Sequence, residues 1–142
     1  MSQVNPVEYI TWVQRSLNRI LKIDLPTNGQ DTSAYRTAVR EFKRKFLGTS
    51  SNDDAVDRET QDALIRQNEM TEYYISWVQT QLLVLGHANL APPSGTKDSK
   101  TIVAIKGFQQ SQKIEADGVV GFFTEAALVR ITRQPPPGDI KV

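Results

Sequence analysis

The chain has 142 residues, of which 23% are charged, and its formal net charge is only +1. This balance argues against wholesale nucleic-acid binding, which needs a basic surface to displace counterions from phosphates. The sequence holds no cysteine and one histidine, His87, so disulfides, thiolate metal sites and histidine clusters are excluded and no cofactor is expected.

Neither a membrane segment nor a secretory signal can be found in the sequence. No apolar run approaches the roughly 20 residues that cross a bilayer, so no membrane span is expected. The polar N-terminus lacks the apolar core of a signal peptide. The sequence therefore leaves the localisation open: we expect the chain to be cytoplasmic as made, and the alternative is delivery to the cell wall as part of a larger protein or assembly.

Three helices are predicted in the first half of the chain. The first begins at Asn5 and Pro6, where a capping side chain precedes proline at the first helical position, and it fades near Asp24. The second starts near Ser33, and Asp57 caps the third. Apolar or small residues recur on each at helical spacing: Ile10, Val13, Leu17, Ile20 and Leu21; Tyr35, Ala38, Val39, Phe42 and Phe46; Thr60, Ala63 and Leu64.

The pattern restarts near residue 70. The segment Tyr9–Gln14 returns as Tyr74–Gln79, 65 residues later, and three further landmarks recur at offsets of 64 to 66 residues. These are Gly29 with Gly95, Phe42 with Phe108, and Thr60 with Thr124. So constant an offset indicates an internal duplication. The sequence predicts an all-α fold of two tandem three-helix units packed together, over 5–69 and 71–133, with an extended proline-rich tail over 134–142.

Gln14 and Gln79 lie at the edge of the apolar stripe of their helices, near 40° on a helical wheel at about 100° per residue. A glutamine in that place can bridge its helix to a neighbouring turn by bonding free backbone groups. We therefore expect a structural role for both.

A glycine turn follows the predicted helix that ends in Phe108-Gln109. Its sequence is Asp117-Gly118-x-x-Gly121-x-x-Thr124, and it leads into a short apolar helix with an Ala-Leu pair. Glycine gives such a turn its backbone freedom. This arrangement resembles the peptidoglycan-binding domain family found beside the catalytic domains of bacterial cell-wall hydrolases, and the chain carries the pattern twice.

The resemblance implies small three-helix units that hold hydrolases on peptidoglycan through a shallow groove near the glycine turns. It assigns the ligand-binding role in the second unit to Ser94, Gly95, Asp117, Gly118, Phe122, Phe123 and Thr124. In that unit Ser94 replaces the aspartate of the family's first Asp-Gly, and Phe122 stands where the family often has proline.

The first unit departs further from the family pattern. Tyr35 replaces a threonine, and Asp53-Asp54 replaces the second Asp-Gly, so a positive φ at residue 54 is disfavoured. If only one unit binds glycan, the resemblance therefore places that binding in the second unit.

Two charged runs and two tryptophans have alternative readings. The acidic residues Asp53, Asp54, Asp57, Glu59 and Asp62 contain the only paired carboxylates that a glycosidase could use. Enrichment of acids at a helix N-terminus is the simpler reading, and we expect no enzyme and no catalytic residue. The basic run Arg36, Arg40, Lys43, Arg44 and Lys45 is either a solvated helix face or a patch for an anionic polymer or acidic partner.

Trp12 and Trp77 lie off the apolar stripe at the same helical phase, at about 200°. Each ring is either buried in a second interface or exposed for a ligand. Burial between the two units is the favoured reading, with ligand stacking as the alternative.

These patterns favour a non-catalytic module that binds peptidoglycan and targets an associated cell-wall hydrolase or effector. The alternative is a protein–protein adaptor or structural subunit of a larger secretion or phage-like assembly that reuses the fold. A complete wall hydrolase is the least favoured reading.

Overall fold

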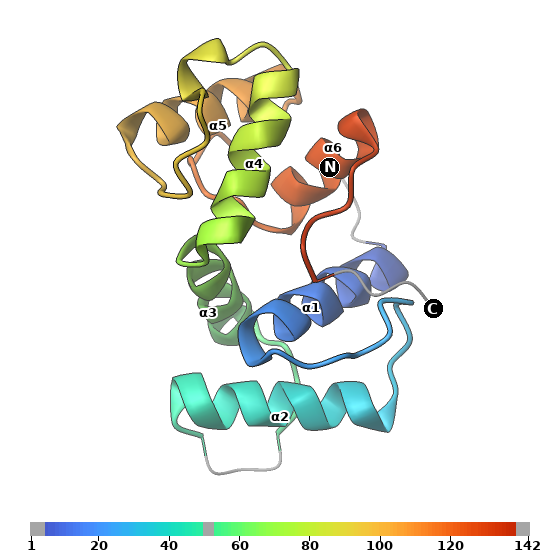
Figure 1. Ribbon diagram of the computed structural model, residues 1–142. Coiled ribbons are helices and arrows are strands. Elements are labelled where there is room, and N and C mark those ends of the chain that lie inside the picture. Colours follow the sequence, from blue (N-terminus) through green and yellow to red (C-terminus); the bar gives the residue numbers. More distant parts are fainter. Residues whose placement is uncertain (1–4, 50–52, 139–142) are drawn as a thin grey trace. The chain divides into compact units, whose positions relative to one another are not determined.

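The computed structural model describes residues 5–49 and 53–138, and every regular element within them is helical (Figure 1). The predicted all-α fold is confirmed. In chain order the elements are α1 (Pro6–Leu21), α2 (Ser33–Leu47), α3 (Arg58–Glu69), α4 (Glu72–Val84), the 3₁₀ turn η1 (Ala88–Leu90), α5 (Ser99–Ser111) and α6 (Phe122–Thr132). Of the helices described, none combines the length and the apolar character that crossing a membrane requires.

Side-chain caps set the start of several helices. Asn5 Oδ1 accepts a hydrogen bond of 2.9 Å from the backbone N–H of Val7 at the start of α1, and proline follows the cap. Asp57 Oδ1 likewise accepts from the third residue after it, at 2.9 Å, and Asp98 does the same for α5 at 3.0 Å. Each cap satisfies a backbone donor that has no partner inside its helix. The predicted caps at Asn5 and Asp57 are confirmed.

The chain divides into two compact units. Among the described residues the first contains those up to Gln67 together with Gly138, and the second runs from Asn68 to Pro137. The sequence placed the boundary at residue 70. In the structure the second unit begins at Asn68, in the last turn of α3, and Glu69 of that turn bonds two later segments of the second unit.

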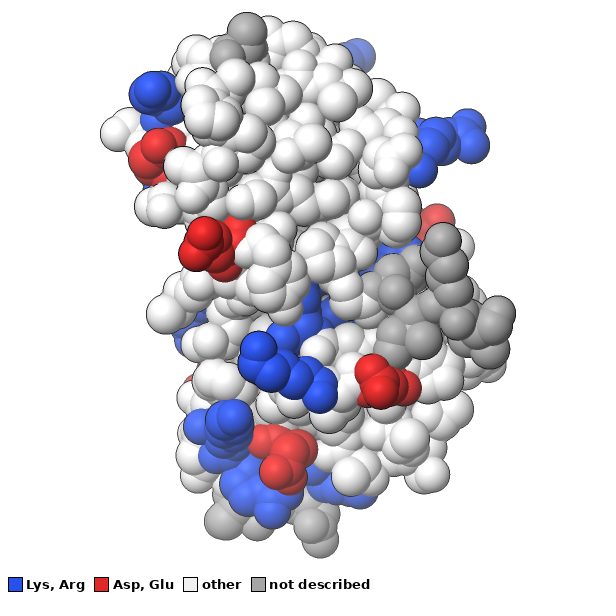
Figure 2. Space-filling model, in the orientation of Figure 1, with Lys and Arg blue, Asp and Glu red and all other residues white. Residues whose placement is uncertain are grey.

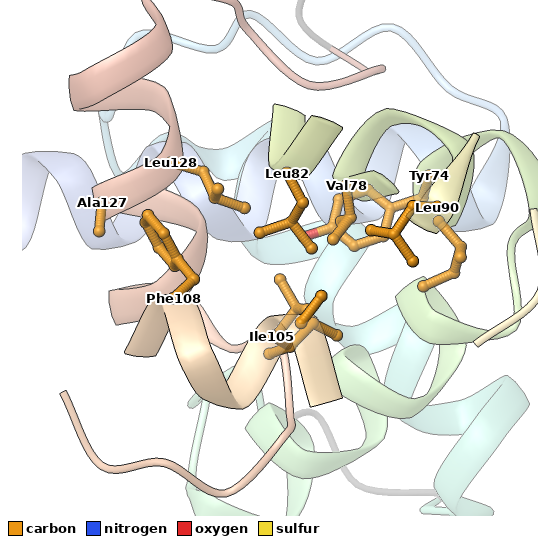
Figure 3. Close-up of a cluster of buried hydrophobic side chains, with 11 residues drawn as sticks. Tyr74, Val78, Leu82, Leu90, Ile105, Phe108, Ala127 and Leu128 are labelled. Atoms are coloured by element: carbon orange, nitrogen blue, oxygen red, sulfur yellow. The ribbon is translucent and has the colours of Figure 1, made fainter. Parts of the chain in front are cut away.

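The core of the second unit is drawn from all of its helices. Figure 3 shows the side chains pointing toward one another. They are Tyr74, Val78 and Leu82 of α4, Leu90 of η1, Ile105 and Phe108 of α5, and Ala127 and Leu128 of α6. In the first unit the buried residues of the predicted stripes are Val13, Leu17, Tyr35, Ala38, Val39, Phe42, Thr60, Ala63 and Leu64.

The described part of the tail has an anchor that the sequence did not indicate. Residues 133–136 have no regular structure, and 137–138 form a turn. The carbonyl oxygen of Gly138 accepts a hydrogen bond of 3.0 Å from Asn18 Nδ2 of α1. Gly138 has a φ of 98°, and a Cβ there would lie 2.6 Å from the carbonyl oxygen of Arg15. The described part of the tail is therefore not only an extended proline-rich segment, because at Gly138 it contacts α1.

Candidate functional site

Gln79 of α4 holds the first glycine turn of the second unit. Its Oε1 accepts from the backbone N–H of Gly95 at 2.9 Å. Its Nε2 donates to the carbonyl oxygen of Thr96 at 3.0 Å and to Thr101 Oγ1 at 2.9 Å. One buried amide therefore fixes the turn 94–96 to α4 and to the start of α5. The bridging role predicted for this glutamine is confirmed.

Gln109 of α5 holds the second turn in the same way. Oε1 accepts from the N–H of Gly118 at 3.0 Å, and Nε2 donates to the carbonyl oxygen of Val119 at 2.9 Å and to Thr124 Oγ1 at 3.0 Å. No role was predicted for this glutamine. The sequence did contain a signal for this role, because Gln109 precedes a glycine turn just as Gln79 does.

A third copy lies in the first unit. Gln14 Oε1 accepts from the N–H of Gly29 at 2.9 Å, and Nε2 donates to the carbonyl oxygen of Gln30 at 3.1 Å. This confirms the bridging role predicted for Gln14. We call these three arrangements the glutamine-clamped turns.

Glycine is required in the clamped turns by conformation and by space. Gly29, Gly95 and Gly118 have φ values of 73°, 78° and 74°, a region that side chains with a Cβ rarely adopt. A Cβ on Gly95 would also lie 2.4 Å from the side chain of Glu72, and one on Gly29 would lie 2.5 Å from Val7. The first clamped turn of each unit therefore lies in close contact with the N-terminal turn of a helix, α1 beside Gly29 and α4 beside Gly95.

The fourth equivalent position has a different chemistry. Lys43, one residue after Phe42 as Gln109 is after Phe108, is buried and donates to the carbonyl oxygen of Ala55 at 2.9 Å and to Asp53 Oδ2 at 2.8 Å. A lysine cannot accept a hydrogen bond, so it cannot hold the following N–H as glutamine does. Asp54, at the place of Gly118, does not have a positive φ, as expected from its sequence.

The residues predicted to bind ligand fall into two groups. Gly95, Gly118, Phe122 and Thr124 are buried, the two glycines within the turns and the other two residues at the start of α6. Ser94, Asp117 and Phe123 are exposed, Phe123 at 44% of its full residue surface. The surface that the turns offer to a ligand therefore consists of a hydroxyl, a carboxylate and an aromatic ring; the contact with ligand itself stays a prediction.

The acidic cluster of the first unit has structural partners. The hydrogen bond from Lys43 is the main cause that holds the pKa of Asp53 below its usual value, and hydrogen bonds from Thr60 do the same for the pKa of Asp57. Asp54 pairs with Arg40 at 3.2 Å. Lowered pKa values do not suit the general acid of a glycosidase, so these contacts favour the helix-terminus reading. No group of three metal-binding side chains occurs in the part of the chain that the structure describes.

Most of the basic run on α2 is neutralised by nearby carboxylates. Arg36 pairs with Asp31 at 2.8 Å, Lys43 with Asp53, and Arg44 with Glu41. Over the part of Figure 2 that the first unit occupies, acidic side chains accordingly lie beside basic ones. Apart from the buried Lys43, the run is a solvent-facing helix surface whose cations mostly pair with nearby carboxylates, which argues against a patch for an anionic polymer.

The two tryptophans have different exposures. Trp12 is buried at 1% exposure, and its ring centroid lies 5.6 Å from that of Tyr9. Trp77 is half-buried, packs against the core of its own unit and lies 5.8 Å from the ring of Tyr74. Full burial of Trp12 leaves it no free face for stacking on a ligand. An interface between the units through these rings stays a prediction.

The second unit combines a helical core, rigid glycine turns and a small polar and aromatic surface, and so has the features of a helical binding module. Its residues 72–128 match the family described as "Putative peptidoglycan binding domain". The family resemblance seen in the sequence is thereby confirmed for α4 to α6. The first unit lies outside the matched residues. No curated protein and no solved structure matched the chain.

Proposed function

We propose that the chain is a non-catalytic module whose second unit binds peptidoglycan through the exposed side of its two glutamine-clamped turns, and that it targets an associated cell-wall hydrolase or effector. The observation that carries this proposal is that a peptidoglycan-binding domain spans both turns. Turns that are already fixed lose little conformational freedom when a ligand binds. The exposed groups suit a glycan, since hydroxyls and carboxylates bond sugar hydroxyls and an aromatic ring covers an apolar sugar face.

We further propose that the first unit is a diverged copy of the second. Matching contacts support this. Tyr9 donates its hydroxyl to Gln61 Oε1 at 2.7 Å, and Tyr74 donates to Glu125 Oε1 at 2.7 Å. Donor and acceptor in the second unit lie 65 and 64 residues after those in the first. The first unit lacks the second clamped turn, so we assign peptidoglycan binding to the second unit alone.

Retention of the full chain on insoluble, purified peptidoglycan tests the function. The wild-type chain should be pelleted with the wall material, and Phe123→Ala should weaken retention about tenfold, which corresponds to the loss of one good aromatic contact. Val84→Ala is the matched control, because Val84 is an apolar residue of the same unit that is 70% exposed and lies at the end of α4, outside both turns. A wild-type chain that stays in solution, while a folded partner protein captures it, would favour the adaptor alternative instead.

A further inference from the structure

Glu69, the last residue of α3, connects the two clamped turns of the second unit. Its Oε2 accepts a hydrogen bond from Lys97 Nζ at 2.8 Å and another from the backbone N–H of Val120 at 2.9 Å. Lys97 directly follows the turn 94–96, and Val120 directly follows the turn 117–119. A single carboxylate oxygen is therefore hydrogen-bonded to the residue that follows each of the two turns.

The contacts of Glu69 are shielded from solvent. The side chains of Glu69 and Lys97 are only 15% and 18% exposed, and Val120 is fully buried. Hydrogen bonds to an ionised acceptor are shorter and stronger than neutral ones, and screening by salt is weaker for partly buried pairs. Removal of the carboxylate would also leave the N–H of Val120 without its acceptor, which is costly for a buried donor.

The role of Glu69 differs from that of the glutamines. Gln79 and Gln109 each fix one turn to a helix, whereas Glu69 fixes the two turns to each other. Glu69 precedes the matched segment 72–128. A fragment cut at the sequence-predicted boundary of residue 71 would lack this connection.

We propose that Glu69 is a positioning residue for the peptidoglycan-binding surface, and this inference rests on the function proposed above. By joining the turns it sets the separation of Ser94 on one turn from Asp117 and Phe123 at the other, so that one ligand can engage all three. Binding groups must be held within a fraction of an ångström to act together. The loss of Glu69 should therefore weaken binding without direct contact between Glu69 and the ligand.

The test uses the full chain and three variants, with binding to purified peptidoglycan measured well below the melting temperature of each. Glu69→Ala should weaken retention about tenfold. Glu69→Gln keeps an oxygen for the N–H of Val120 but loses the charge opposite Lys97, so its retention should be intermediate. Glu115→Gln removes the same charge from an exposed residue of the same unit and should bind as the wild type does.

Amide spectra of the same proteins separate positioning from a general loss of stability. In Glu69→Ala the signals of Val120, Gly95 and Gly118 should shift together, while those of the first unit stay in place. In Glu69→Gln the shift at Val120 should be smaller, because an acceptor remains. If Glu69→Ala fails to fold, Glu69→Gln and Lys97→Met carry the test with the same two measurements.

The outcomes separate this inference from the function on which it rests. Retention of the wild type together with equal retention of Glu69→Ala overturns the positioning role and leaves the function standing. Reduced retention with unmoved signals of Gly95 and Gly118 also overturns it, because the turns have then kept their places. A wild-type chain that does not bind overturns both.

Discussion

In both units the second turn is hydrogen-bonded to the middle helix of its unit, but the side chain that makes the bond differs: it is Lys43 in the first unit and Gln109 in the second. In both, a buried side chain from the middle helix donates to a turn carbonyl at 2.9 Å, to Ala55 in one unit and to Val119 in the other. Gln109 also accepts from the turn, whereas Lys43 cannot, and its charge is balanced by Asp53. The comparison shows that the helix-to-turn contact persists while the acceptor half of the clamp is lost, and with it the need for glycine.

The largest expected effect tests whether the two units share one core design. Phe108→Ala should lower the free energy of unfolding by about 3–5 kcal/mol, as a truncation inside a packed core. Phe42→Ala, at the equivalent position of the first unit, should cost a similar amount, because Phe42 and Phe108 are 0% and 4% exposed. Urea unfolding of both variants measures this. An unchanged midpoint for either one would show that the core of that unit does not depend on its phenylalanine.

The clamps themselves should differ in their energetic weight. Gln109→Leu has nearly the same shape but leaves the N–H of Gly118 without its acceptor, and we expect a loss of about 3 kcal/mol. Lys43→Met should cost only about 1 kcal/mol, because the carboxylate it leaves behind, that of Asp53, is 49% exposed and can be hydrated. Chemical denaturation gives both values. A larger loss for Lys43→Met would reverse our ranking of the two turns.

A smaller expected effect distinguishes two reasons for glycine at a turn, namely its positive φ and the lack of space for a side chain. Gly95 and Gly48 both have positive φ, but a Cβ on Gly48 meets nothing within 4 Å, whereas one on Gly95 would collide with Glu72. We expect Gly48→Ala to cost about 1 kcal/mol and Gly95→Ala about 2 kcal/mol. Thermal unfolding should rank them in that order, and equal losses would mean that the helix beside Gly95 adjusts freely.

The smallest effect is a difference in pH dependence. The pKa of Asp53 is lowered in the folded chain, so its contribution to stability is complete above the ordinary carboxyl value of 3.8 and is lost as the pH falls through the lower folded value. Asp53→Asn should therefore flatten the fall in stability below pH 3.8. Unfolding curves of the wild type and of Asp53→Asn, collected from acid to neutral pH, measure this difference. An equally steep fall in stability below pH 3.8 in both proteins would contradict the stabilising role of the Asp53 carboxylate.

Much of the fold follows from local sequence, and part of the site does as well. Asn5 and Asp57 are caps whose hydrogen bonds span two or three residues, and Gln14 revealed its role by its place beside the stripe. Lys43 was misleading, because a lysine within a basic run on a helix is expected to face solvent. Its burial depends on an acceptor ten residues away, across a loop.

Contacts between segments that are distant along the chain could not be predicted from the sequence. Glu69 and Val120 are 51 residues apart, and neither carries a local pattern that pairs them. The acidic residue could equally have been a solvated helix end, as Glu59 is on the same helix. The sequence likewise does not show that Phe123 is exposed and Phe122 buried, because this difference arises only when α6 packs on its core.

The hydrogen bond between Asn18 and Gly138 has a consequence for synthesis of the chain on the ribosome. Its partners are 120 residues apart, so at roughly 5–20 residues per second Asn18 is synthesised about ten seconds before Gly138. In the folded chain the Asn18 amide also exchanges two hydrogen bonds with the backbone of Leu25, at 2.7 and 2.9 Å, and these need only residues that are made early. The nascent first unit can thus close its α1 loop early, and the contact with Gly138 is added to a helix that has already formed.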